Sequence, residues 1–185
     1  LYLVIAPLAA ALVAGNRAML KVSEASPNFE QWLADALPKY FAADEVTLIK
    51  GGVEVAQAFS QLPFDHLFFT GSTAVGKHIM KAAAHNLTPV TLELGGKSPV
   101  VVTPSAELAK TVNRVWTGKT MNAGQTCIAP DYVLMQADKK HAFIEQSTAW
   151  LDAHYPNLAD NPDYSFIINP KQASRVQGYL DEAKQ

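Results

Sequence analysis

Hydrophobic and polar positions along the chain follow two periods. Short apolar runs bounded by glycine, proline or polar residues are typical of buried strands, and longer segments with apolar residues three and four apart are typical of helices. The expected strands cover 18–22, 46–49, 66–70, 89–94, 100–102 and 132–135, and the expected helices cover 6–14, 28–37, 54–61, 74–85, 105–120 and 138–151. This alternation predicts an α/β fold with parallel strands covered by helices.

Composition narrows the classes of partner. The chain has 185 residues, 49% hydrophobic and 17% charged, which is typical of a globular protein. Its 15 basic and 17 acidic residues give a net charge of -2 and form no basic stripe, so nucleic acid is not indicated. A single cysteine allows no internal disulfide, which favours a cytoplasmic location.

Both ends of the sequence suggest an internal fragment of a longer chain. The apolar run from Leu1 to Val13 begins without methionine and is too short to span a bilayer, so we expect no membrane segment here. The last residues, from Tyr179 to Gln185, have a helical pattern with no cap.

Two polar segments follow expected strands. The run FTGSTAVG at 69–76 passes from a strand into a helix, where glycine lets a ligand approach the backbone and a helix N-terminus attracts phosphate. An ordinary helix cap at Ser72 explains the same residues equally well. Lys21 and Glu24 follow the first strand, where an acidic residue can bind ribose hydroxyls, although a solvated loop pair is the simpler reading of the two alone.

The chain pairs one thiol with one carboxylate in glycine-bearing segments. Cys127 ends the run NAGQTC at 122–127, and Glu93 begins the run ELGGKSP at 93–99, where we expect its carboxyl to be partly buried. A nucleophile and a base of this kind can form a covalent intermediate and then hydrolyse it. Taken alone, each has a simpler explanation: a buried core cysteine and a glutamate in a salt bridge. The histidines show no metal-binding spacing, so we predict no metal.

Taken together, the sequence resembles the NAD(P)-dependent aldehyde dehydrogenase superfamily over essentially its whole length. The resemblance rests on four runs in order: KVSE at 21–24, FTGSTAVG at 69–76, ELGGKSP at 93–99 and NAGQTC at 122–127. The continuation IAPDYVL at 128–134 is similar to the class 3 branch, which includes coniferyl aldehyde dehydrogenases. The resemblance implies a parallel Rossmann-like sheet over 1–118, as part of the NAD(P)-binding domain. Residues 119–185 would begin a second α/β, catalytic domain that carries the nucleophile.

The resemblance also implies a mechanism. Cys127 attacks the aldehyde to form a thiohemiacetal, which is oxidised to a thioester, and Glu93 activates the water that releases the carboxylic acid. By this likeness Lys21 and Glu24 hold the adenosine ribose. Ser72 contacts the pyrophosphate, Gly71 allows close approach of the cofactor, and Gly95 lies beside the nicotinamide.

The cofactor expected is NAD or NADP, and Glu24 favours NAD because a carboxylate repels a 2′-phosphate. The partners expected are a small-molecule aldehyde and, in the full-length protein, a second copy in a homodimer. The family's oxyanion asparagine and second cofactor glutamate would lie outside 1–185, so we expect this piece alone to be inactive. Two alternatives stay open: a dehydrogenase that passes the acyl group to coenzyme A, and a non-catalytic relative.

Overall fold

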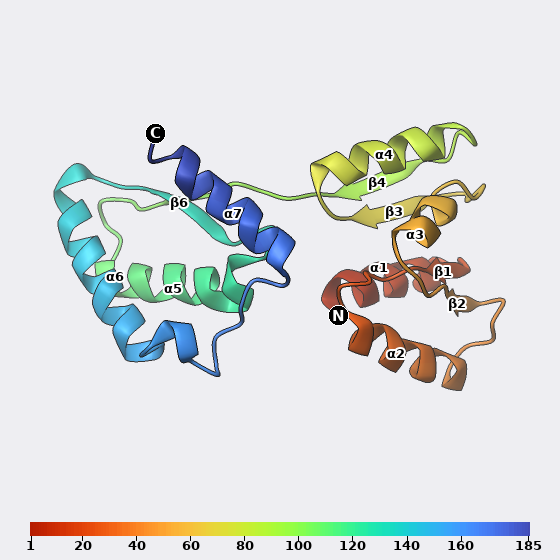
Figure 1. Cartoon of the computed structure of the whole chain (residues 1–185), viewed down its shortest axis with the longest axis horizontal. Coiled ribbons are helices and arrows are strands. Elements are labelled where there is room, and N and C mark those ends of the chain that lie inside the picture. Colours follow the sequence, from red (N-terminus) through yellow and green to blue (C-terminus); the bar gives the residue numbers. More distant parts are fainter. The chain divides into compact units, whose positions relative to one another are not determined.

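The structure is a computed structural model that describes all of residues 1–185. It divides into two compact units, Leu1–Leu94 and Gly95–Gln185, which are described separately. The first unit contains α1 (Tyr2–Val13), β1 (Ala18–Leu20), α2 (Pro27–Ala36), β2 (Val46–Leu48), α3 (Val53–Phe59), β3 (Leu67–Thr70), α4 (Thr73–Ala84) and β4 (Val90–Glu93), as Figure 1 shows. A short 3₁₀ turn, η1 (Leu37–Lys39), extends α2.

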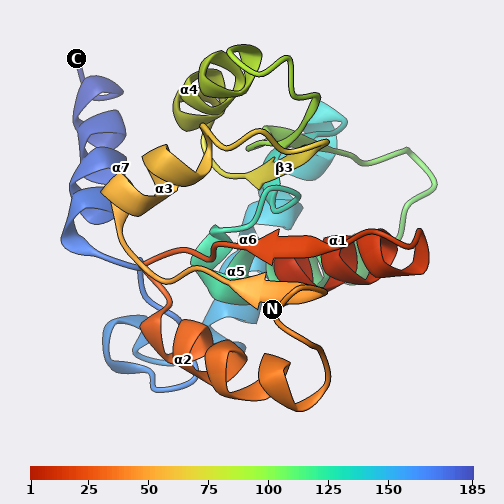
Figure 2. The same cartoon turned by 90° about the vertical axis from the view of Figure 1, so that its right-hand side faces the viewer.

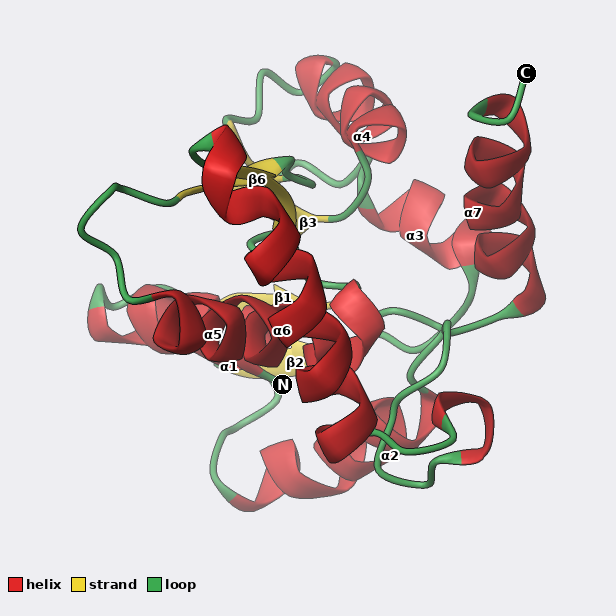
Figure 3. Ribbon diagram, turned by 90° about the vertical axis from the view of Figure 1, so that its left-hand side faces the viewer, coloured by secondary structure: helices red, strands yellow, loops and turns green.

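The second unit contains β5 (Ser98–Val101), α5 (Leu108–Thr120), β6 (Pro130–Leu134), α6 (Lys140–His154) and α7 (Pro170–Glu182). Three 3₁₀ turns accompany them: η2 (Met121–Gly124), η3 (Ala137–Lys139) and η4 (Leu158–Asp160). Helices α5 and α6 cross each other in Figure 3, and the indole nitrogen of Trp150 on α6 donates to Asn113 Oδ1 on α5 at 2.8 Å.

The predicted α/β class with parallel strands is confirmed. The strands pair in twos, β1 with β2, β3 with β4 and β5 with β6, and every pair is parallel. The carboxyl ends of both strands in a pair therefore lie at the same edge, where polar residues can converge. The predicted division into a cofactor part, 1–118, and a catalytic part, 119–185, concerns function and stays a prediction.

The main core of the first unit lies where α1 and α2 cover the β1–β2 pair, a region visible in Figure 2. Its buried members are Leu8, Val22, Leu33, Leu37 and Val46. These residues come from successive segments of the chain. The apolar positions that predict the helices and strands are therefore also the positions that pack together in the core.

A second contact fixes α4 on the β3–β4 pair. A Cβ atom added to Gly76 would lie 2.9 Å from Leu94 Cδ2, so a larger residue at this position would require the Leu94 side chain to shift. Gly76 is buried, one turn beyond the start of α4. The close approach brings the N-terminal end of α4 to the strand edge that carries the candidate site.

Helix ends follow the sequence signals closely. Gly15 adopts φ +79° after α1, and the backbone of Gly15 and Asn16 donates back to Leu12 and Ala11, as expected for a glycine C-cap. Pro27 begins α2, one residue before the expected start at 28, and the Ser26 hydroxyl before it makes no capping hydrogen bond. The start of α7 was not predicted, yet Asn169 and Pro170 carry the same signal: Asn169 Oδ1 accepts from Gln172 N at 3.0 Å.

No helix has both the length and the apolar character needed to cross a bilayer.

Leu33→Ala should destabilise the chain, because Leu33 is only 2% exposed at the centre of the core. We expect a loss of about 2–5 kcal/mol in the free energy of unfolding, from lost burial and the cavity left behind. Urea unfolding of the 185-residue chain, followed by circular dichroism, measures it. Leu180→Ala is the matched control, since Leu180 is 54% exposed and should cost well under 1 kcal/mol. Equal losses in the two variants would contradict the assignment of the core.

Candidate active site

Cys127 lies in a turn between η2 and β6. The turn runs from Thr126 to Ala129 and is closed by a hydrogen bond from Ala129 N to Thr126 O at 3.0 Å. The cysteine is exposed, so the alternative of a buried core residue is wrong. An exposed thiol can meet a substrate.

The three residues before Gln125 form an unusual left-handed stretch. Asn122 has φ 54° and ψ 32°, Ala123 has φ 53° and ψ 31°, and Gly124 has φ 73°. Asparagine and glycine adopt this region at little cost, but alanine does so rarely and with strain. Such strain persists only where surrounding contacts hold it, and it clusters at functional sites.

The Gln125 side chain supplies those contacts. Its Nε2 donates to Asn122 O at 2.9 Å and to Phe166 O at 3.1 Å, and its Oε1 accepts from Ile168 N at 2.9 Å. Asn122 Nδ2 in turn donates to Gln125 O at 3.1 Å. No local pattern points to Gln125, because its distant partners lie 41 and 43 residues further along the chain.

The Cys127 turn also rests against the segment that follows Gly95. A Cβ atom added to Gly96 would lie 2.6 Å from the Cys127 carbonyl oxygen, so no side chain fits there without moving the turn. Ser98 Oγ lies 3.5 Å from the same oxygen. These contacts follow from the parallel register of β5 and β6, which pairs Ser98 with Pro130.

An irregularity in that register brings a charge pair to the site. The pairing advances from Ser98–Pro130 to Pro99–Tyr132, so Asp131 is left without a partner across the strands. Its carboxylate contacts Lys97 Nζ at 2.7 Å. Because the Lys97 side chain is highly exposed, this ion pair contributes little to stability.

Glu93 is the last residue of β4 and lies opposite Thr70 of β3. Its carbonyl accepts from Gly71 N at 3.0 Å, so the structure brings Gly71, Ser72 and Glu93 to one edge of the β3–β4 pair. Glu93 is exposed, which corrects the expected partial burial of its carboxyl. The reason is local: β4 has a strand neighbour on one side only, and Glu93 stands at its end.

Ser72 begins α4 as a helix cap. Its Oγ accepts from Val75 N at 3.3 Å, which is the ordinary structural role considered for this residue. The preceding Gly71 lies under the Phe69 ring, and an added Cβ would come within 2.5 Å of that ring. A side chain at position 71 would therefore displace the ring of Phe69, a residue of β3.

Lys21 and Glu24 bind each other. Lys21 Nζ donates to Glu24 Oε2 at 3.0 Å, with the lysine side chain largely buried and the glutamate about half exposed. The pKa of Glu24 is lowered, first by a hydrogen bond from its own backbone and then by the Lys21 ammonium. Glu24 is therefore fully ionised at neutral pH.

The predicted site residues fall into both units. Lys21, Glu24, Gly71, Ser72 and Glu93 belong to the first, whereas Gly95 and Cys127 belong to the second. Gly95 has open space where a Cβ would stand, so packing within this chain does not require glycine there. The pairing of Glu93 with Cys127 stays a prediction.

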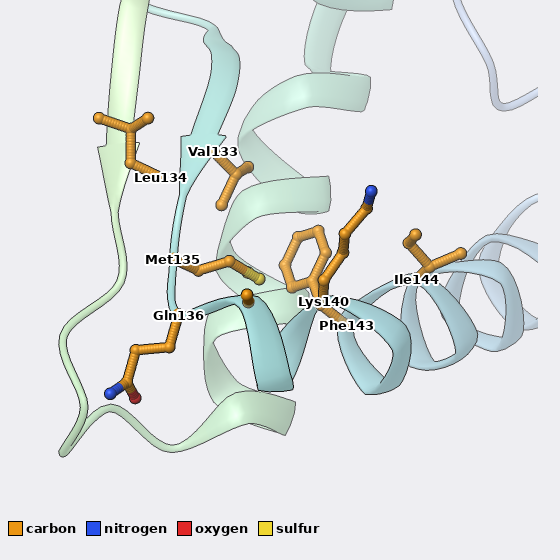
Figure 4. Close-up of a pocket in the computed structure, with 8 residues that line it drawn as sticks. Val133, Leu134, Met135, Gln136, Lys140, Phe143 and Ile144 are labelled. Carbon is orange, nitrogen blue, oxygen red and sulfur yellow. The ribbon is translucent and has the colours of Figure 1, made fainter.

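A hollow of about 330 Å³ lies elsewhere in the second unit. Figure 4 shows Val133, Met135 and Phe143 gathered between the end of β6 and the start of α6, with Gln136 pointing away. Its lining includes neither Cys127 nor Gln125. It is an apolar hollow apart from the candidate chemistry. No group of three or more His, Cys, Asp or Glu side chains is placed to hold a metal ion.

The sequence profile of the aldehyde dehydrogenase family matches residues 1–185. The chain therefore belongs to the aldehyde dehydrogenase family. It is 52% identical over 185 residues to a probable coniferyl aldehyde dehydrogenase of Pseudomonas aeruginosa, covering all of this chain and 39% of that protein. The chain spans under two fifths of the length of this and the next curated relatives it matches.

Solved structures agree with that membership. The substrate-bound state of Staphylococcus aureus AldH superposes with a TM-score of 0.87 at 42% identity, covering 96% of this chain and 39% of that one. A Mycobacterium tuberculosis aldehyde dehydrogenase complexed with NAD⁺ gives 0.82 at 30% identity, covering 92% and 36%. The α/β fold predicted from the sequence is thus the family's fold.

The pKa of the Glu24 carboxyl should lie below the ordinary value of 4.5 for glutamate. Because the folded-state pKa is depressed, ionised Glu24 stabilises the fold at pH values above 4.5, and this contribution is lost as the pH falls through the lower folded pKa. NMR titration of the Glu24 carboxyl carbon measures the shift. Lys21→Met should raise the Glu24 pKa only part of the way back to 4.5, because the backbone hydrogen bond remains. A midpoint at or above 4.5 in the unchanged chain would contradict the assignment.

Proposed function

We propose that the protein oxidises an aldehyde to its carboxylic acid with NAD, using Cys127 as nucleophile and Glu93 as base. The observation that carries this proposal is the Cys127 turn. Cys127, the only thiol within residues 1–185 of this aldehyde dehydrogenase family member, is exposed. It follows a strained segment that several hydrogen bonds hold in place. Strain maintained by surrounding contacts is expected where a reacting group must be positioned.

The chemistry begins at the thiol. The Cys127 thiolate adds to the aldehyde carbon, and the carbonyl oxygen takes the negative charge of a thiohemiacetal. The backbone amide of Cys127 is a donor for that oxyanion. NAD, when bound, supplies the hydride acceptor. Loss of hydride from the same carbon, with the carbon–oxygen double bond re-formed, would leave a thioester on Cys127.

Glu93 completes the reaction by accepting a proton from water. The water oxygen adds to the thioester carbon, the carbon–sulfur bond breaks, and carboxylic acid and thiolate result. Glu93 stands three residues before Gly96, whose backbone touches the Cys127 turn.

The first unit offers groups that fit NAD. Ser72 and the backbone amides at the start of α4 are donors suited to a pyrophosphate. Gly71, the residue before them, places no side chain there, and the Phe69 ring lies against it. Lys21 and Glu24 follow β1, and their ammonium and carboxylate groups can form hydrogen bonds with ribose hydroxyls. The ionised Glu24 supports NAD over NADP, because a 2′-phosphate there would meet a negative charge.

The name of the Pseudomonas relative supports an aromatic phenylpropenyl aldehyde, coniferyl aldehyde, as the substrate. The class 3-like continuation IAPDYVL after Cys127 supports the same choice. The expected homodimer and cytoplasmic location stay predictions.

Cys127→Ala in the full-length protein should abolish NADH formation from coniferyl aldehyde, since Cys127 is the proposed nucleophile and the only thiol within residues 1–185. Absorbance of NADH over time measures the rate, with hexanal and benzaldehyde as comparison substrates. Ile128→Ala, which changes the exposed neighbour but keeps the thiol, is the matched control and should retain turnover. Retained turnover in Cys127→Ala would overturn the nucleophile assignment.

Glu93→Gln should slow the steady state by about 10²–10⁴-fold, the usual contribution of a general base. The first turnover should survive, because forming the thioester does not use this carboxylate. Stopped-flow measurement would then show a burst of NADH followed by a slow phase. Glu107→Gln, an exposed glutamate paired with Lys110, is the control and should leave both phases unchanged.

Two results would contradict the base role of Glu93. One is an unchanged steady-state rate in Glu93→Gln. The other is an acyl-coenzyme A product from the unchanged protein when coenzyme A is supplied, because that reaction needs no activated water.

A further inference from the structure

Two sets of contacts hold the segment that carries Cys127. The Cys127 carbonyl lies against Gly96, which has no side chain. Just before the turn, the side chain of Gln125 bonds the backbone of Phe166 and Ile168, in the segment that leads into α7.

The Gln125 side chain forms hydrogen bonds with backbone groups of Phe166 and Ile168 that a neighbouring strand could otherwise bond. Its amide nitrogen donates to Phe166 O at 3.1 Å, and its amide oxygen accepts from Ile168 N at 2.9 Å. One planar carboxamide thus bonds a donor and an acceptor two residues apart. Few other side chains offer both functions at this length.

The same carboxamide also holds the left-handed stretch. Gln125 Nε2 donates to Asn122 O, and Gln125 N donates to that same oxygen at 3.0 Å. Ala123 stays at positive φ only while such contacts outweigh its strain. Cys127 follows two residues later, so relaxation of this stretch would move the thiol.

We propose that Gln125 is a positioning residue for Cys127: it couples the strained stretch 122–124 to the Phe166–Ile168 backbone and so sets where the thiol stands. The proposal rests on the proposed function of Cys127 as nucleophile. Gln125 is exposed, and its bonds compete with water, so its loss should alter local geometry far more than global stability.

The test replaces Gln125 by methionine, which has similar length and no amide, in the full-length protein. We expect kcat with coniferyl aldehyde to fall about tenfold to a hundredfold, the range that a small misplacement of a reacting group produces. KM should change less than threefold, and the thermal midpoint should change little. Asn86→Leu is the matched control: it removes a distant amide bond, Asn86 Nδ2 to Gln61 O at 2.8 Å, and should leave kcat unchanged.

A second-site change distinguishes positioning from general damage. Ala123→Gly removes the strain at positive φ, because glycine adopts this region freely. In the Gln125→Met background it should restore part of kcat. A further variant, Gln125→Glu, keeps an acceptor for Ile168 N–H but loses both donors, and it should also lower kcat.

Amide hydrogen exchange measures the coupling between segments 122–124 and 166–168 without relying on activity. Amides of 166–169 and 121–128 should exchange faster in Gln125→Met and at the normal rate in Asn86→Leu. Unchanged exchange, or kcat within twofold of the unchanged protein, would overturn the proposal. The proposal would also be overturned if Gln125→Met and Asn86→Leu lowered kcat equally and lowered the thermal midpoint equally. Failure of the proposed function appears elsewhere, as turnover that survives in Cys127→Ala.

Discussion

The parallel pairing of β5 with β6 is the constraint on which the candidate site depends. Because Ser98 pairs with Pro130, the segments that precede the two strands meet side by side. One segment carries Gly96 and continues back to Glu93, and the other is the Cys127 turn. Their backbones approach so closely that only glycine fits at position 96. A register displaced by a few residues would separate Gly96 from the Cys127 turn.

A second constraint is the left-handed stretch 122–124, which directs the chain from the end of α5 into the Cys127 turn. It costs conformational energy at Ala123, and side-chain amides of Asn122 and Gln125 offset that cost. The strained loop and the glycine contact act on the same four-residue turn. Two independent sets of contacts therefore hold the turn that carries the exposed thiol.

Elements defined by local signals could be predicted from the sequence. Gly15 after α1, Pro27 at the start of α2 and the apolar run 89–94 each carry a reason that a few neighbouring residues supply. Asn169 and Pro170 carried such a signal as well, and α7 begins there. By contrast, the pairing of strands in twos depends on contacts between distant segments, which periodicity does not encode.

The candidate site divides in the same way. Cys127, Glu93 and the loop at Gly71 and Ser72 stand out by residue type and spacing. That Gly71, Ser72 and Glu93 share one strand edge is visible only in the structure. The exposure of Glu93 was not predicted, because it follows from the position of β4 beside a single strand. Gln125 was not singled out, since its partners Phe166 and Ile168 are adjacent only after folding.

The central claim is that Cys127 forms a covalent thioester during aldehyde oxidation. Rapid acid quench of the full-length protein with coniferyl aldehyde and NAD, followed by peptide mass mapping, tests it most directly. The peptide that contains Cys127 should gain the mass of the aldehyde minus two hydrogen atoms, because an acyl group replaces the thiol hydrogen. Steady oxidation with no adduct on that peptide, or an adduct on another residue, would contradict it.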